Sequence, residues 1–181
     1  MRRSTQKLAL SALFLSLGIL LPFLTGQIPK IGSMLLPMHI PVLLCGFICG
    51  WPYGLAVGFI TPLFRSLLFG VPAPYPQAPA MALELAAYGL IVGLLYQKLP
   101  KKPVFAYLSL LAAMLGGRMI WGAASALLYG AGGNAFTLTA FISGAFLNSI
   151  PGMLLQILFV PTVVIILEKA IFSKYGRSVS V

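Results

Sequence analysis

Few side chains of this chain could do chemistry, because 60% of its residues are hydrophobic and only 8% are charged. Arg118 and Glu84 stand out, since each lies inside a long apolar run. A charged group in hydrocarbon is costly, so such a residue marks a binding site or a pathway by default. An arginine suits a carboxylate, because the guanidinium can donate two parallel hydrogen bonds. These residue types favour the binding of a small anionic molecule.

A second arginine, Arg65, lies near the far end of another apolar run. We place Arg65 and Glu84 each about five residues from the same membrane surface, which is roughly 8 Å of depth at ~1.5 Å per residue. We therefore expect an Arg65–Glu84 ion pair, which either serves the site or is purely structural. If Arg65 forms an ion pair with Glu84, Arg118 stays free to bind the carboxylate of a ligand.

Four other residues complete the candidate site. Tyr88 lies one helical turn beyond Glu84, Trp121 lies one turn beyond Arg118, and Asn148 is expected at a similar depth. His39 begins an apolar run at its outer edge, where it is either a ligand contact or an interfacial histidine. The seven predicted substrate-binding residues are His39, Arg65, Glu84, Tyr88, Arg118, Trp121 and Asn148.

The sequence lacks the motifs of several enzyme classes. It has no GxxxxGK[ST] phosphate loop and no HExxH motif, and a single histidine cannot make a metal site alone. Cys45 and Cys49 lie in an apolar run, where we expect small buried thiols rather than metal ligands. We predict a protein that is not an enzyme and that has no cofactor. The net charge of +10 comes mainly from residues between and beyond the apolar runs, which suits lipid and topology rather than nucleic acid.

The apolar runs predict an all-α, polytopic membrane protein, because a soluble domain carries roughly 25% charged residues. A spanning helix needs about 20 apolar residues. We expect one membrane-embedded substrate-binding domain over residues 1–181, in which Gly50, Trp51 and Pro52 form a tight turn and Pro151 and Pro161 bend the last helix. The six expected transmembrane helices are residues 7–24, 37–50, 53–69, 79–97, 104–129 and 138–172.

The basic residues set the expected orientation. Six spans place three basic clusters on one side, and the opposite loops hold only Lys30. By the positive-inside rule both termini are then cytoplasmic. The three clusters are Arg2, Arg3 and Lys7, then Lys98, Lys101 and Lys102, and finally Lys169, Lys174 and Arg177.

The three opposite loops, residues 25–36, 71–78 and 130–137, are rich in Gly, Pro and polar amides. Four prolines in and just after the middle loop predict a stiff, extended segment. Such loops either form a lid over an outward-facing cavity or are plain connecting turns.

One long stretch, residues 34–96, carries a resemblance to a known family. It reads MLLPMHIPVLLCGFICGWPYGLAVGFITPLFRSLLFG, then a Pro-rich loop, then MALELAAYGLIVGLLY. Together with the length, the six expected helices and the basic N-terminus, this stretch resembles the substrate-binding S components of energy-coupling-factor (ECF) vitamin transporters. It looks like the pantothenate-type branch of that family.

The resemblance implies a subunit that captures a vitamin or its precursor near the outer face of a bacterial inner or plasma membrane. The loop after the first helix would cap the pocket. A transmembrane coupling protein and two ATPase subunits would be its partners. The family docks through an Ala-xxx-Ala motif on the first helix, and the nearest match here is Ala12-xxx-Ser16, with Ala9 one turn earlier.

Three alternatives stay open at this point. The ligand could be another vitamin, such as pyridoxine, a pyrimidine precursor, folate or riboflavin. The chain could instead be an intramembrane enzyme or chaperone-like membrane protein that uses Glu84 and His39. A small channel is a third reading, but the polar residues stop at mid-depth, which favours a closed pocket over a pore.

Overall fold

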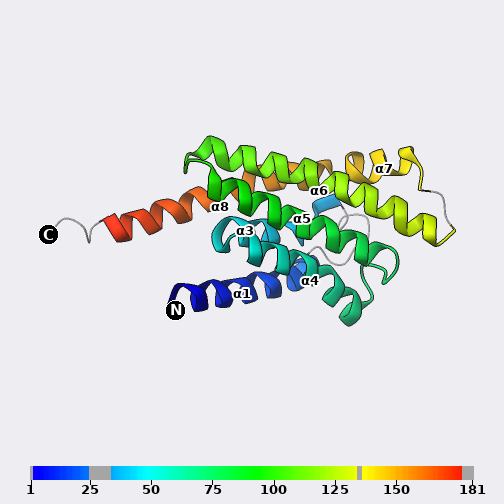
Figure 1. The fold of residues 1–181 in the computed structure, drawn as a ribbon, viewed down its shortest axis with the longest axis horizontal. Coiled ribbons are helices and arrows are strands. Elements are labelled where there is room, and N and C mark those ends of the chain that lie inside the picture. The colour runs from blue at the N-terminus through cyan, green and yellow to red at the C-terminus, as the bar shows by residue number, and fades with distance from the viewer. Residues whose placement is uncertain (1, 25–33, 134–135, 177–181) are drawn as a thin grey trace.

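The computed structural model describes residues 2–24, 34–133 and 136–176, and every regular element in these ranges is a helix (Figure 1). The all-helical prediction is therefore confirmed for this part of the chain. In chain order the elements are α1 (Arg2–Leu24), α3 (His39–Cys49), α4 (Trp51–Phe69), α5 (Gln77–Lys98), α6 (Pro103–Ala131), α7 (Leu138–Ala145), the 3-10 turn η1 (Leu147–Ser149) and α8 (Ile150–Gly176).

Five segments are long and apolar enough to cross a bilayer, namely Ser4–Leu24, Trp51–Phe69, Gln77–Lys98, Pro103–Ala131 and Leu138–Leu167. The remaining apolar helix, α3, has 11 residues. At ~1.5 Å per residue it is about 16 Å long, well short of a hydrocarbon core of about 30 Å. By length and composition the described residues therefore hold five candidate spans rather than the six expected.

Helix α3 is short because it is a core helix. Ten of its 11 residues are buried, and it packs against α1, α4, α5 and α8. A helix that is apolar on all sides has no face for water, which fits this position. The predicted tight turn after it is confirmed, because only Gly50 separates α3 from α4. Gly50 has a φ of 99°, a conformation that side chains with a Cβ rarely adopt.

Helices α4 and α5 approach each other through glycines. A Cβ on Gly54 would lie 2.8 Å from the Gly89 carbonyl oxygen and 2.8 Å from the Gly46 Cα of α3. A Cβ on Gly58 would likewise meet the backbone of Leu85. Small residues let membrane helices pack at this distance. The contact fixes α5 against both α3 and α4, and therefore fixes the height of the polar side chains that α5 carries.

Arg65 joins α4 to α1. Its Nη1 donates a hydrogen bond of 2.8 Å to the carbonyl oxygen of Ile19. The guanidinium carbon lies 5.1 Å from the ring centroid of Phe23 and 5.9 Å from that of Phe69. The predicted Arg65–Glu84 pair is therefore wrong, because this guanidinium turns toward α1 and is held there by a carbonyl and two aromatic faces.

The last predicted helix, residues 138–172, is broken. Helix α7 ends at Ala145, Phe146 and η1 follow, and α8 begins at Ile150. The break precedes Pro151, which lies in the first turn of α8, where a missing backbone N–H costs nothing. Pro161 lies inside α8, which continues through it. The interruption expected at Pro151 thus falls just before it, at residues 146–149, and α8 stays helical through Pro161.

The Pro-rich connection between α4 and α5 is compact rather than extended. It forms a turn at residues 74–76, and the Ala78 N–H donates to the Ala73 carbonyl. The peptide bonds Val71–Pro72 and Tyr75–Pro76 are cis. The Tyr75 hydroxyl in this turn donates a hydrogen bond of 2.6 Å to the carbonyl oxygen of Leu128. The loop is therefore attached to the end of α6.

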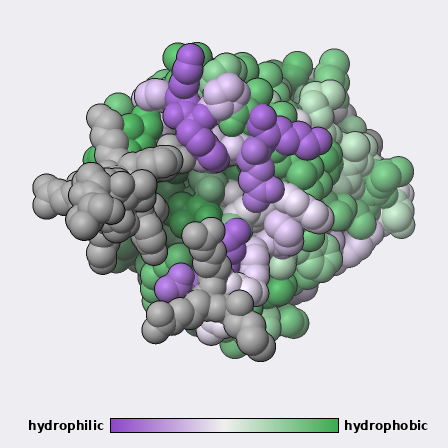
Figure 2. Space-filling view, turned by 60° about the vertical axis from the view of Figure 1, so that its left-hand side comes forward, coloured by the Kyte–Doolittle hydropathy of each residue, from purple (hydrophilic) through white to green (hydrophobic). Residues whose placement is uncertain are grey.

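The two ends of the molecule differ in polarity. The start of α1, the α5–α6 connection and the end of α8 lie at one end (Figure 1). Hydrophilic side chains gather there, while the flanks are apolar (Figure 2). Exposed lysines of this end include Lys7, Lys98, Lys101 and Lys102. The flanks expose large apolar side chains of α1, α4, α6 and α8, a surface that suits lipid rather than water.

The glycine contact between α4 and α5 predicts a stability loss. A Cβ in Gly89→Ala would collide with the Gly54 backbone, which cannot move aside as a side chain can. We expect the substitution to cost about 1–3 kcal/mol of stability, measured as a lower melting temperature of the protein purified in detergent. Gly130→Ala is the matched control, because a Cβ there meets nothing within 4 Å. Equal melting temperatures for the two variants would contradict the close approach.

Candidate functional site

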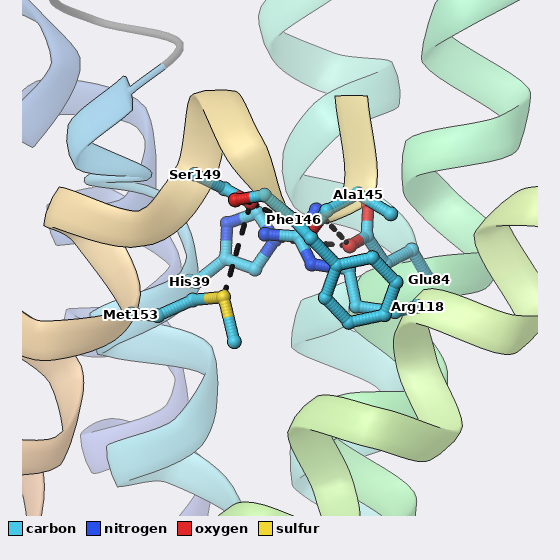
Figure 3. Close-up of polar contacts among 7 residues, drawn as sticks. All are labelled: His39, Glu84, Arg118, Ala145, Phe146, Ser149 and Met153. Atoms are coloured by element: carbon cyan, nitrogen blue, oxygen red, sulfur yellow. Dashed lines mark hydrogen bonds and ion pairs between the residues drawn. The ribbon is translucent and has the colours of Figure 1, made fainter. Parts of the chain in front are cut away.

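Three polar side chains meet where α3, α5 and α6 come together (Figure 3). His39 is the first residue of α3, Glu84 lies in the second turn of α5, and Arg118 lies near the middle of α6. Arg118 Nη1 is 3.0 Å from Glu84 Oε1, and His39 Nε2 is 3.5 Å from the same oxygen. We call these three residues the polar cluster. One carboxylate oxygen holds it together.

The cluster is almost completely buried. The relative exposures of His39, Glu84 and Arg118 are 1%, 2% and 3%. Within the described part of the chain, Arg118 Nε and Nη2 and both ring nitrogens of His39 have no hydrogen-bond partner. A buried donor without a partner costs about 1–3 kcal/mol, and more if it is charged. The cluster therefore has hydrogen-bonding capacity that the described side chains do not use.

Tyr88 extends the cluster along α5. Its ring meets the His39 ring edge-to-face, with centroids 5.1 Å apart. The side chain is fully buried, and its hydroxyl has no partner among the residues that the structure describes. A Cβ on Gly117 would collide with this ring, so the glycine before Arg118 makes room for Tyr88. The structure thus brings together four of the seven residues predicted from the sequence.

The α7–η1–α8 segment lies next to the cluster. Phe141 of α7 packs against Gly122, one turn beyond Arg118, and Gly152 of α8 packs against the Met34 and Leu35 backbone that leads into α3. Between these contacts, Ser149 donates 2.6 Å to the Ala145 carbonyl. Figure 3 shows Phe146 and Ser149 in the same region as the polar cluster. The broken helix therefore borders the site between α6 and α3.

Trp121 lies beside the cluster rather than in it. Its ring contacts Phe136 at 5.7 Å and Phe141 at 6.3 Å between centroids, and it closes on Gly144. Beside these rings an open apolar groove of about 340 Å³ runs between α6 and the start of α7, lined by Met119, Gly122, Ala123, Ala126, Phe136, Thr137, Leu138 and Phe141. Trp121 thus packs α6 onto α7.

Two predicted site residues lie elsewhere. Asn148 is exposed, and its Nδ2 donates 3.3 Å to the Ser143 hydroxyl. Arg65 is held by α1, as described above. His39 is buried at the start of α3, next to the Glu84 carboxylate. The loop predicted to cap the pocket, residues 25–36, lies largely outside the described residues, and so does Lys30.

Sequence reasoning missed polar residues of the last segment. Ser149 is buried at the break, one residue after the exposed Asn148. Gln156 is fully buried, and neither atom of its amide has a partner among the described residues. A signal for Gln156 was present, because it is a lone amide in a long apolar run. No signal placed Ser149, because the 3-10 turn that decides which side chain faces inward was not predicted.

The described residues hold no group of three His, Cys, Asp or Glu side chains that could bind a metal ion. Cys45 and Cys49 are free and buried in α3. What the site offers is one ion pair, a second edge of the Arg118 guanidinium, an imidazole and a phenol. Such a set can bind and orient a polar molecule.

Comparison with known proteins assigns the family. The family model "ECF transporter, substrate-specific component" matches residues 6–168. No curated protein and no solved structure matches the chain. Members of this family are transporter subunits rather than enzymes; they bind small-molecule substrates and work with ECF transmembrane and ATPase modules. With its several apolar helices, this multi-pass membrane protein belongs to the family of substrate-specific components of ECF transporters.

Proposed function

We propose that the chain captures its substrate at the polar cluster of His39, Glu84 and Arg118, with Tyr88 as a further contact. The observation that carries this is the Nε and Nη2 edge of Arg118, which is buried and unpaired among the described residues. A guanidinium edge of this kind is rarely left empty in a protein interior, because its donors lose water without gaining a partner. A bound substrate would supply that partner.

The charge pattern supports a proposed orientation. With the basic end of the molecule in the cytoplasm, both termini are inside and α7 and the α4–α5 connection face outward. The chain would then pass six times through a bacterial plasma membrane. The cluster would be reached from outside, and the chain would form one membrane-embedded domain.

The main argument for pantothenate, the vitamin predicted from the sequence, no longer holds. That argument required Glu84 to pair with Arg65 and leave Arg118 free, but Glu84 pairs with Arg118. Pantothenate stays a prediction, and so do pyridoxine, a pyrimidine precursor, folate and riboflavin. The reading as an intramembrane enzyme is not supported, because the family is one of transporter subunits.

The proposed docking surface is on α1. Ala9, Ala12 and Ser16 are all exposed, and the Ser16 hydroxyl is turned back onto the Ala12 carbonyl at 3.0 Å. These three side chains are small, and the Ser16 hydroxyl already has its hydrogen bond within α1. They therefore form a strip along α1 on which another membrane helix can pack closely. We propose that the transmembrane coupling protein, driven by two ATPase subunits, binds this strip.

Loss of the arginine edge should release the substrate. Gently purified wild type is expected to retain a small molecule that native mass spectrometry detects. In Arg118→Gln the site loses charged hydrogen bonds worth about 1.5–3 kcal/mol, or at least about tenfold in affinity, so the retained molecule should be absent. Arg65→Gln is the matched control, because Arg65 contacts α1 instead of the cluster. Full retention by Arg118→Gln would rule out this site.

A bulky side chain on the α1 strip should block assembly. Ala12→Trp adds a large ring where we place the coupling helix, so co-purification of the coupling protein and the ATPases should fall sharply while the small molecule is still retained. Leu158→Trp, on the exposed face of α8, is the control for a bulky surface residue. If both variants assemble like wild type, the docking surface lies elsewhere.

A further inference from the structure

We infer that the substrate of this site is an uncharged polar ring compound rather than a free carboxylate. The inference rests on the proposed function, since it assumes that the substrate contacts the polar cluster. Its basis is the charge balance of that cluster, the kinds of hydrogen-bonding atom it leaves unused and the aromatic rings that border it.

The charges of Arg118 and Glu84 already balance each other. Arg118 contributes one positive charge and Glu84 one negative charge, and they are 3.0 Å apart. A carboxylate placed on the second edge of Arg118 would lie near the Glu84 carboxylate in a buried, low-dielectric site, where like charges repel each other strongly. An uncharged ligand keeps the balance.

The unused atoms are both donors and acceptors. Arg118 Nε and Nη2 can only donate, the Tyr88 hydroxyl can donate or accept, and Glu84 Oε1, which makes no hydrogen bond with the described residues, can only accept. A carboxylate offers acceptors only, so it would satisfy the arginine edge and leave the accepting atoms empty. A ring nitrogen or carbonyl beside a hydroxyl or amino group offers both kinds of partner.

The borders of the site favour a flat molecule. The rings of His39 and Tyr88 stand edge-to-face within the cluster, and Figure 3 shows Phe146 in the same region as His39, Glu84 and Arg118. Phe146 is itself packed edge-to-face on Phe141 at 6.0 Å between centroids. Aromatic side chains bind ring compounds through stacked or edge contacts that an extended aliphatic chain cannot make.

Ligand-induced stabilisation of the purified wild-type protein tests the charge inference. The probes are pyridoxine and 4-amino-5-hydroxymethyl-2-methylpyrimidine, both of zero net charge near neutral pH, against pantothenate, an anion. We expect at least one uncharged ring compound to raise the melting temperature and to bind at least about tenfold more tightly than pantothenate, a difference of about 1.4 kcal/mol. Stabilisation by pantothenate alone, or by none of the three, would overturn the inference.

A charge variant provides a second readout. Glu84→Gln leaves Arg118 without its counter-charge, so the ratio of pantothenate affinity to pyridoxine affinity should rise at least about tenfold over wild type. An unchanged ratio would overturn the inference. Failure of the proposed function would look different, because Arg118→Gln would then still retain the natural ligand. A natural ligand that requires Arg118 and is an anion would overturn only the charge inference.

Discussion

The ion pair between Glu84 and Arg118 is the constraint on which the rest of the structure depends. A carboxylate or a guanidinium alone at this depth in an apolar bundle would be strongly destabilising. Each is tolerated because the other lies 3.0 Å away. The pair also ties α5 to α6, and through His39 it reaches α3. Any movement that separates these helices must therefore also separate two buried charges.

The apolar packing around the pair puts it in place. Gly54, Gly58 and Gly89 bring α4 onto α5, and Gly117 clears the space that Tyr88 occupies. Because α3 begins at His39, its first side chain is buried next to the Glu84 carboxylate, with Nε2 3.5 Å from Oε1. Because the chain is interrupted at η1, the α7–η1–α8 segment changes direction next to the cluster. Small residues, a short helix and a broken helix together make a polar site inside an apolar protein.

Composition and apolar runs were enough to predict an all-helical protein and the approximate positions of its helices, but not the shortness of α3 or the break at η1. The tight turn at Gly50 and the buried nature of Glu84, Tyr88 and Arg118 also followed from residue types. The partners of the charges did not, since depth along a helix says nothing about the direction in which a side chain points. Arg65 and Arg118 were both candidates for Glu84, and only the rotation of α4 decides between them. The inward face of residues 145–149 could not be predicted either, because it depends on a single 3-10 turn.

The choice of partner explains why one corrected contact changes the functional reading. If Glu84 paired with Arg65, Arg118 would be left without a counter-charge and the site would suit an anionic ligand. With Glu84 on Arg118, these two charges compensate each other, and buried polar atoms of the cluster remain without a hydrogen-bond partner among the described residues. The family stays the same in either case, since it follows from the whole chain and not from this pair.

A double-mutant cycle on Glu84 and Arg118 tests the central claim most directly. Melting temperatures would be compared for wild type, Glu84→Leu, Arg118→Met and the double variant in one detergent. If the two charges hold each other, each single variant loses about 3–5 kcal/mol because it leaves a buried charge unpaired, and the double variant recovers most of that loss. If the losses of the single variants simply add in the double variant, the two side chains are not paired in the folded protein and the account fails.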